Sequence, residues 1–220
     1  DGYALAPFVV RSSNNAGKTV VNYGLTTVAA YNKFGGTSAY RGIDNTAVGK
    51  AKVISFDRPI DSAWALPHFI RHEAAVAIAA DRNLTDAAWT TSVDMHSGAT
   101  SLSGVTSIIT SGHDEYWTVA QRKAIDKALS KGTNLFITGG NTLYWRVRLQ
   151  ASSVGPNRQM AIYKEKSADP VKNSAETTVR WRHSPKGNPE SKISGTVYNN
   201  WHDVCNEEPN DWIVTDPTWW

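Results

Sequence analysis

The segment GHDEYW, residues 112–117, concentrates side chains that can do chemistry. It follows a run of apolar and β-branched residues typical of a buried strand, and an amphipathic stretch typical of a helix comes after it. A plain turn needs a glycine and one polar residue, whereas this one adds an imidazole, two carboxylates and a phenol. These groups belong to His113, Asp114, Glu115 and Tyr116. Taken singly, Asp114 or Glu115 could cap the helix and His113 could be an ordinary turn residue, but together they favour a functional site.

The elements expected around this segment bring a further polar group to the same place. Residues 105–112 and 133–141 are predicted as buried strands that end in glycine, and residues 118–132 as the helix between them. Ligands of an open parallel sheet bind beyond the carboxyl ends of its strands. The sequence therefore predicts that Asn141 and the side chains of segment 112–117 converge at one sheet edge, where the amides of the helix N-terminus favour anionic groups.

The residue types at this edge favour a metal site over a nucleophilic one. A hydrolase nucleophile would be a serine or cysteine in a glycine-flanked elbow. Here Ser111 precedes Gly112, which supports a serine triad only weakly, and the single cysteine, Cys205, lies far along the chain. Carboxylate and phenolate oxygens are hard ligands that suit an oxidised cation such as ferric iron, and such an ion can act as a Lewis acid and activate water.

Other parts of the chain supply the elements that must hold this edge. A helix is predicted for residues 65–83, whose apolar residues recur at helical spacing, while residues 19–32 begin as a strand and then lose the pattern. Further strands, the last two expected to be antiparallel, are predicted within residues 6–12, 51–59, 88–96, 176–183 and 193–201. Buried strands that alternate with amphipathic helices predict an α/β fold with a mostly parallel sheet and antiparallel C-terminal additions.

The composition places bounds on the class of protein. The chain has 220 residues, enough for one domain with a substantial core. A net charge of +3 without a block of Lys or Arg gives no indication of nucleic-acid binding, and no apolar run is long enough to span a membrane. No signal peptide is visible, so a soluble chain is expected, and one cysteine excludes an intramolecular disulfide. The sequence starts without Met and ends in apolar residues, which predicts a fragment of a longer polypeptide.

Several motifs along the chain resemble one known family. They are VVNYGLTTVAAYNKFGGTSAY (20–40), GHDEYW (112–117), GGNTLYWRVRL (139–149) and SVGPNRQMAIYK (153–164). The likeness runs from about residue 6 to the end, where NDWIVTDPTWW (210–220) belongs to it. Together they resemble the large (beta) subunit of N,N-dimethylformamidase, in its C-terminal, glutamine-amidotransferase-like domain. The resemblance implies a three-layer, flavodoxin-like sandwich of the class I glutamine-amidotransferase type whose nucleophilic cysteine has been lost.

The resemblance also implies a metal centre. In that enzyme a mononuclear iron, held by two tyrosines and one glutamate, hydrolyses a small amide. Glu115 is the counterpart of the glutamate, and Tyr31 and Tyr40 are the candidates for the tyrosines. Tyr144 is a reserve candidate, and Tyr116 is less favoured because its side chain is expected to point away from Glu115.

The implied mechanism assigns roles to the remaining polar residues. The ferric ion (Fe³⁺) would polarise the carbonyl of a small amide and activate water, while His113 handles protons and Asn141 orients the carbonyl. Lys164 could serve the same pocket or be an ordinary surface lysine. Because the enzyme is a hetero-oligomer with a small subunit, the resemblance implies homo- or hetero-oligomeric assembly.

Other polar groups have weaker claims to chemistry. His68 and His72 stand four apart, a spacing that can bind zinc, but the His-Glu-x-x-His order of zinc hydrolases is missing and no metal is assigned to them. Asp94 and His96 could support the predicted site or cap a loop. Residues 180–183 could clamp a carboxylate, but charges that discourage pairing at a strand edge are the favoured interpretation.

The leading function is therefore metal-dependent hydrolysis of a small C–N (amide) bond. The alternative is a non-catalytic or carbohydrate-associated binding domain that keeps the fold without activity. Nine tryptophans, many beside polar residues, could line a ligand groove, but an ordinary core edge is the favoured interpretation.

Overall fold

Four parallel strands form a sheet through the centre of the molecule. The computed structural model describes residues 7–184 and 188–198. The strands of this sheet are β1 (Thr19–Tyr23), β3 (Ala87–Thr91), β4 (Ser107–Thr110) and β6 (Asn134–Ile137). They pair in the order β3-β1-β4-β6, so the chain adds β3 on one side of β1 and then β4 and β6 on the other. The carboxyl ends of β1 and β4 thus lie side by side where the strand order reverses, a place where open α/β sheets bind ligands.

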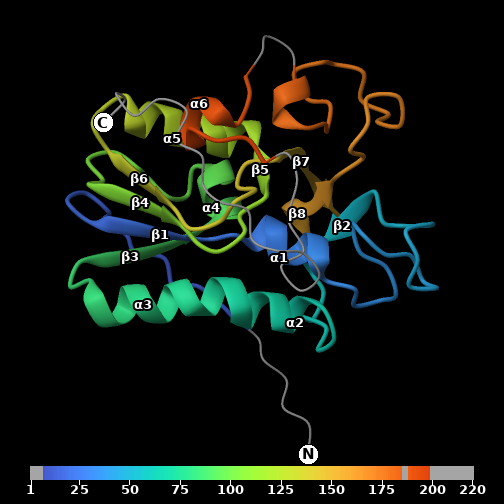
Figure 1. Ribbon diagram of the computed structural model, residues 1–220, viewed down its shortest axis with the longest axis horizontal. Coiled ribbons are helices and arrows are strands. Elements are labelled where there is room, and N and C mark those ends of the chain that lie inside the picture. The colour runs from blue at the N-terminus through green and yellow to red at the C-terminus, as the bar shows by residue number, and fades with distance from the viewer. Residues whose placement is uncertain (1–6, 185–187, 199–220) are drawn as a thin grey trace, which may run out of the picture.

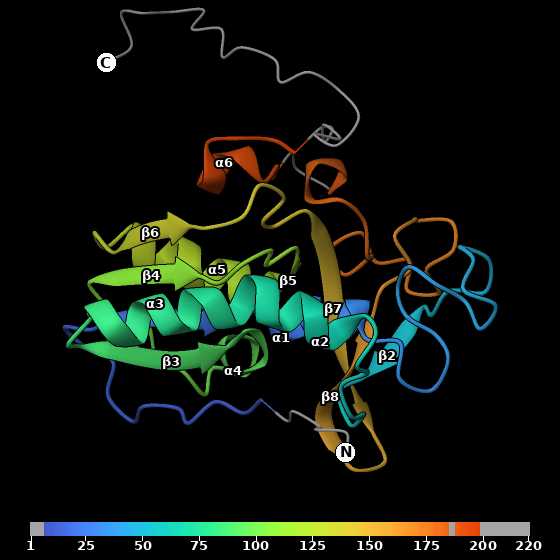
Figure 2. The same ribbon diagram turned by 60° about the horizontal axis from the view of Figure 1, so that its bottom comes forward.

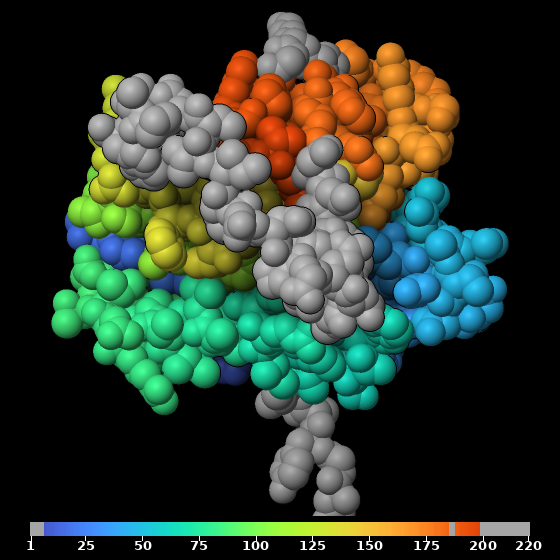
Figure 3. Space-filling view, viewed as in Figure 1, coloured from blue at the N-terminus to red at the C-terminus, as the bar shows by residue number. Residues whose placement is uncertain are grey.

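Helices cover both faces of this sheet, as Figures 1 and 2 show from two directions. One long helical segment lies along one face, whereas α4 and α5 lie on the other. In the space-filling view the long segment forms the lower surface of the molecule (Figure 3). The helices are α1 (Leu25–Tyr31), α2 (Ala65–His68), the π-helical turn η1 (Phe69–Ala74), α3 (Ala75–Asn83), α4 (Ser92–Ser97) and α5 (Val119–Leu129).

A second, mixed sheet stands beside the carboxyl ends of the parallel strands (Figure 2). Its strands are β2 (Val53–Ser55), β5 (Tyr116–Thr118), β7 (Trp145–Ser152) and β8 (Gly155–Ala161), in the order β2-β8-β7-β5. β7 and β8 form an antiparallel hairpin, and β5 pairs in parallel with β7. Because β5 starts inside segment 112–117, the turn that carries Glu115 is held between the two sheets.

Two clusters of buried side chains stabilise this arrangement. One joins the parallel sheet to α4 and α5 and includes Val20, Ile125 and Trp117. The other joins α1 to the mixed sheet and includes Ile54 and Tyr116. Successive side chains of a strand point to opposite faces, so Tyr116 and Trp117, both fully buried, connect the two clusters through β5. Burial of an aliphatic side chain in these clusters, such as Ile54, contributes roughly 1.5–3 kcal/mol.

The predicted central elements are confirmed, mostly with shorter bounds. The buried strands predicted at 105–112 and 133–141 are β4 and β6, and the helix predicted at 118–132 is α5. The helix predicted at 65–83 contains α2, η1 and α3. The strands predicted at 51–59 and 88–96 are present as β2 and β3, and α4 follows β3 because the Thr91 hydroxyl caps it by accepting a hydrogen bond from the Asp94 amide.

Other predicted elements differ from the structure in whole or in part. Residues 7–12 form no strand. The strand predicted at the start of 19–32 is present as β1, and residues 25–31, where the strand pattern is lost, form α1 because their side chains pack into the core despite their β-branched composition. Residues 181–183 form a short 3₁₀ helix, η2 (Trp181–His183), and only Arg180 makes an isolated bridge to Trp145. Within the described part of 193–201 there is no strand, and α6 (Ser191–Ser194) overlaps its start. The antiparallel strands occur earlier, as β7 and β8.

The fold is therefore a mixed α/β architecture with a parallel four-stranded sheet and a second mixed sheet. None of the helices in the described ranges has both the length and the apolar character required to cross a membrane. Cys205 and the motif at 210–220 lie outside the described residues.

Candidate functional site

Segment 112–117 leaves β4 at the point where the strand order reverses and continues into β5. The amide of Tyr144, in the loop after β6, donates a hydrogen bond to the carbonyl oxygen of Glu115 at 2.9 Å. From the opposite side, the hydroxyl of Thr27 in α1 accepts a hydrogen bond from the Glu115 amide at 2.9 Å. The position of Glu115 is thus fixed by two elements that are distant in sequence.

Two glycines allow these elements to approach each other. Gly112 has φ +53°, in the left-handed region, and a Cβ atom there would lie 2.5 Å from the Cβ atom of His72. A Cβ atom on Gly139 would collide with the carbonyl oxygen of Gly112. A side chain at either position would push the helix or the loop after β6 away from the candidate site.

The carboxylate of Glu115 lies between two phenols. Tyr31 donates a hydrogen bond to Oε2 at 3.0 Å, and Tyr40 lies 2.7 Å from Oε2 and 2.9 Å from Oε1. The rings of Tyr31 and Tyr40 stack, with centroids 4.5 Å apart. The structure therefore brings together Tyr31, Tyr40 and Glu115, the three residues that the family resemblance implies as ligands. The prediction for Tyr116 needs correction, because its buried hydroxyl hydrogen-bonds the Tyr40 hydroxyl and so joins this group.

A hollow of about 550 Å³ opens onto these three residues. His113 lies in its wall, with Nε2 3.9 Å from Oε2 of Glu115. Asn141 is also in the wall and is 8% exposed, and its Oδ1 atom has no hydrogen-bond partner among the described residues. Both predicted partners of Glu115 are therefore at the same hollow, with polar atoms that a ligand could engage.

Two more residues of the hollow carry polar groups. Tyr144, the reserve candidate, lies in the wall, but within the described ranges its phenol hydroxyl makes no hydrogen bond to the Glu115 carboxylate. Lys164 places Nζ 4.0 Å from the centroid of the Tyr40 ring. Of the two interpretations open for Lys164, the structure favours the pocket over the surface.

Burial controls the charge of this hollow. Burial raises the pKa of the Glu115 carboxyl. Burial is also the main reason why the pKa values of Tyr31 and Tyr40 are raised, and the charges of neighbouring phenol and carboxylate groups raise them further. Burial also lowers the pKa of Lys164 to about 8. Without a bound cation the phenols are therefore neutral, and they donate hydrogen bonds to the carboxylate.

A cluster of three histidines includes His113 from the wall of the same hollow. His68 and His72 come from the long helical segment and His113 from segment 112–117. One ring nitrogen of each lies within 4.8 Å of the other two, so the cluster could hold a metal ion. Burial lowers the pKa of His68 to about 3 and also lowers the pKa of His72 and His113. The sequence shows the spacing of His68 and His72, but not that a third histidine meets them.

Two buried carboxylates lie beneath the site. Glu73, in η1, accepts hydrogen bonds from the Ser111 hydroxyl and from the Gly24 amide, the latter at 3.3 Å. Asp114 accepts a hydrogen bond from Asn22 at 2.9 Å. Burial raises the pKa of Glu73 to about 7, and burial together with the charge of Glu73 raises the pKa of Asp114. Asp114 was predicted to converge with the site residues but points into this buried layer.

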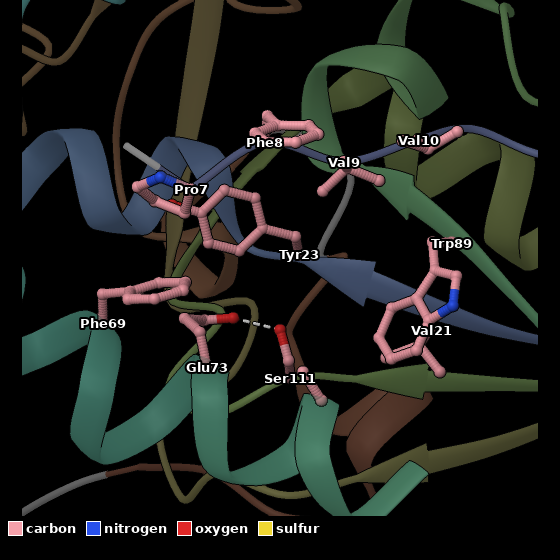
Figure 4. A pocket seen from close by; sticks show the side chains of 11 residues that line it. Pro7, Phe8, Val9, Val10, Val21, Tyr23, Phe69, Glu73, Trp89 and Ser111 are labelled. Atoms are coloured by element: carbon pink, nitrogen blue, oxygen red, sulfur yellow. Dashed lines mark hydrogen bonds between the residues drawn. The ribbon is translucent and has the colours of Figure 1, made fainter. Parts of the chain in front are cut away.

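A second, mainly apolar hollow of about 280 Å³ lies on the other side of Glu73 (Figure 4). Its walls come from residues 7–10, from β1 and β3, and from the long helical segment, and Figure 4 shows Glu73 hydrogen-bonded to Ser111 at one side. The hydroxyl of Tyr23 is buried there without a hydrogen-bond partner in the described chain. Nothing in the sequence analysis indicates this hollow.

The other candidate groups serve structure. Asp94 pairs with Arg11 at 2.6 Å and bonds the hydroxyl of Thr91, and His96 bonds the hydroxyl of Thr118, which caps α5. Of the two roles left open for Asp94 and His96, capping is the one that the structure supports.

The basic residues at 180–183 act differently from the prediction. Arg182 pairs with Glu190 of the same chain, and the Arg180 guanidinium lies 5.1 Å from the centroid of the Tyr144 ring. Residues 181–183 form a 3₁₀ helix and Arg180 itself bridges Trp145, so the interpretation as charges that discourage strand pairing is wrong.

A search among curated proteins returned no match to this chain. A family model described as "N,N-dimethylformamidase beta subunit-like, C-terminal" matches residues 1–220, so the chain belongs to this family.

Proposed function

We propose that this chain hydrolyses the C–N bond of a small amide at a metal ion held by Tyr31, Tyr40 and Glu115. The convergence of two phenols on one buried carboxylate carries the proposal. Membership of the N,N-dimethylformamidase beta subunit-like family supports hydrolysis of an amide as the reaction class. The hollow of about 550 Å³ is of a size that holds a small molecule.

The donor set fits a ferric ion. Three oxygen-bearing side chains already lie within hydrogen-bond distance, and loss of the phenol protons would make all three hard anionic ligands. Because burial raises the pKa of both phenols, a strongly charged cation is required to hold them as phenolates. Bound there, ferric iron would supply Lewis acidity toward an amide carbonyl and water.

The neighbouring residues supply proton transfer and orientation. Burial favours the neutral form of His113, which can accept a proton at a ring nitrogen and return it to the leaving amine. The side-chain amide of Asn141 can donate a hydrogen bond to the substrate carbonyl oxygen. Lys164 places its amino group over the Tyr40 ring, where a positive charge offsets the negative charge of the phenolates and carboxylate.

At the level of fold, we propose one domain of the flavodoxin-like, class I glutamine-amidotransferase-like type. The order β3-β1-β4-β6 supports this, because counted along the parallel sheet it is the order 2-1-3-4 that begins the flavodoxin-like pattern. The family description names a beta subunit, which supports assembly of this chain with other subunits.

The test is metal analysis of the purified chain together with its visible spectrum and its hydrolysis of N,N-dimethylformamide. We expect one iron per chain, a tyrosinate-to-iron absorption band and release of amine. Tyr40→Phe and Glu115→Gln should each lose the band and at least about 100-fold in hydrolysis, because each removes a ligand.

Tyr144→Phe is the matched control, since it removes a phenol from the wall of the same hollow without removing a proposed ligand. It should retain iron and the band. A folded wild-type chain that binds no iron when iron is supplied would contradict the proposal, as would a Tyr40→Phe variant that keeps the band. Either result would favour a binding domain without catalytic activity.

A further inference from the structure

We propose that His68, His72 and His113 form a second metal site, which takes a divalent cation of the zinc class. One ring nitrogen of each histidine lies within 4.8 Å of the other two. Tetrahedral zinc with Zn–N bonds of about 2.0–2.1 Å requires nitrogens about 3.4 Å apart. We expect small rotations of the side chains to close that difference.

The two ring nitrogens of His68 have no hydrogen-bond partner among the described residues, and a bound cation would give one of them a ligand bond. Both nitrogens are buried. The ring stacks on Tyr31, with centroids 4.1 Å apart and planes 23° from parallel. Stacking accounts for the position of the ring but leaves two buried polar atoms unsatisfied, at a cost of about 1–3 kcal/mol each. A cation bound to one nitrogen removes part of that cost.

The backbone is shaped to bring the histidines together. The π-helical turn η1 begins directly after His68 and contains His72, and such turns occur frequently at functional sites. Gly112 then lets the neighbouring segment contact the backbone of His72, because any side chain there would collide with it. The next residue in that segment is His113, whose ring centroid lies 5.4 Å from that of His72.

The ligand chemistry identifies the class of cation. Three imidazoles suit zinc and similar borderline divalent ions, whereas the phenols and carboxylate of Glu115's cluster suit a harder ion. Three protein ligands also leave a fourth position for water or a small anion. Since His113 belongs to both groups, a cation on the histidines would compete with the proton transfer proposed for His113.

Titration of the metal-free full chain with Co²⁺, followed by its visible ligand-field spectrum and by competition with Zn²⁺, tests the site. The wild type should bind one equivalent, and His68→Gln and His72→Ala should each weaken binding more than about 10-fold. His183→Ala, which removes an exposed histidine of η2, should bind like the wild type. Circular dichroism of each variant verifies the fold, and two separate histidine variants keep the test valid if one fails to fold.

Tyr40→Phe separates this site from the proposed iron site. It should retain Co²⁺ binding while it loses the iron band. Unchanged Co²⁺ affinity in both histidine variants would overturn the inference, and so would loss of Co²⁺ binding in Tyr40→Phe with retention in His72→Ala. Failure to bind iron leaves this result unaffected, so the two proposals fail independently.

Discussion

Asp169 and Glu115 are both buried, with 0% and 4% of their surfaces exposed, yet their partners differ. Asp169, in the loop after β8, accepts hydrogen bonds from the Arg148 guanidinium at both oxygens, at 3.2 and 3.3 Å. The amides of Val171 and Thr178 and the hydroxyl of Thr178 donate further hydrogen bonds. Burial alone would raise the pKa of Asp169, but the hydrogen bonds from Arg148 and Thr178 outweigh it and lower the pKa.

Glu115 has neutral phenols where Asp169 has a guanidinium, and burial raises its pKa. The same region holds two incompletely satisfied carboxylates, since Glu73 and Asp114 each have one buried oxygen without a partner in the described residues. The structural carboxylate of Asp169 has its charge matched by a guanidinium, whereas the carboxylate of Glu115 accepts hydrogen bonds from neutral phenols and can still take a cation as ligand. This contrast separates the structural region around Asp169 from the candidate site more clearly than burial does.

The largest effect is expected when the structural pair is broken. Asp169→Asn keeps the shape of the side chain but removes the negative charge opposite Arg148, whose side chain is 17% exposed. The new side-chain amide group would also point its N–H donors at the donors that now bond Asp169. Removing one charge of a buried ion pair leaves the other charge unpaired and lowers the free energy of unfolding by about 3–5 kcal/mol. Urea unfolding at pH 7 measures the loss.

The matched control is Asp57→Asn, which breaks an ion pair with Arg158 on the surface and should cost less than about 1 kcal/mol. If the two substitutions cost the same, Asp169 is not the structural anchor that its contacts indicate.

A smaller effect, with a defined pH dependence, is expected at Glu73. Its pKa is about 7 in the folded chain and 4.5 in the unfolded one, so between these values the folded chain binds more protons. Stability from this group is therefore full below pH 4.5 and is lost as pH rises through 7, by about 3 kcal/mol in total. Glutamine does not ionise, so Glu73→Gln removes this loss. The free energy of unfolding of the variant minus that of the wild type should therefore be larger at pH 8 than at pH 4.

Urea unfolding in the presence of EDTA measures that difference without interference from metals. Asp169 provides the opposite case, because its lowered pKa means that its contribution is lost as pH falls below the ordinary value of 3.8. If the stability difference between Glu73→Gln and the wild type is the same at pH 4 and pH 8, Glu73 is not a buried carboxylate with a raised pKa, and the prediction fails.

Much of the candidate site follows from the sequence because a general rule places it. His113, Glu115 and Asn141 follow buried strands, and parallel strands end at a common edge. Tyr31 and Tyr40 needed a family resemblance, since no local pattern shows that α1 and the loop after it fold back onto that edge. The three-residue cluster is thus predictable in its carboxylate and not in its phenols.

The remaining errors come from tertiary contacts that override local preference. α1 contains the β-branched Thr26 and Thr27, which favour a strand locally, but both hydroxyls find long-range partners in the helical form. In the hairpin of β7 and β8, the β7 sequence alternates apolar and polar residues as a strand does, but the β8 sequence shows no such alternation. The sequence therefore carries a signal for only one strand of the pair. His68 and His72 carry a known spacing, but only the folded chain supplies their third neighbour, His113.

The smallest effect on stability, and the sharpest test of the comparison, is expected for Glu115→Gln in the metal-free chain. The amide oxygen of glutamine can accept the hydrogen bonds of Tyr31 and Tyr40, and no buried charge then has to be held. The free energy of unfolding in EDTA should change by less than about 1 kcal/mol, in contrast to the chemically identical loss of charge in Asp169→Asn. A loss as large as that of Asp169→Asn would make Glu115 a structural carboxylate and remove the basis for assigning it to a metal. A folded, equally stable variant that no longer binds iron would show that Glu115 serves metal binding and does not stabilise the fold.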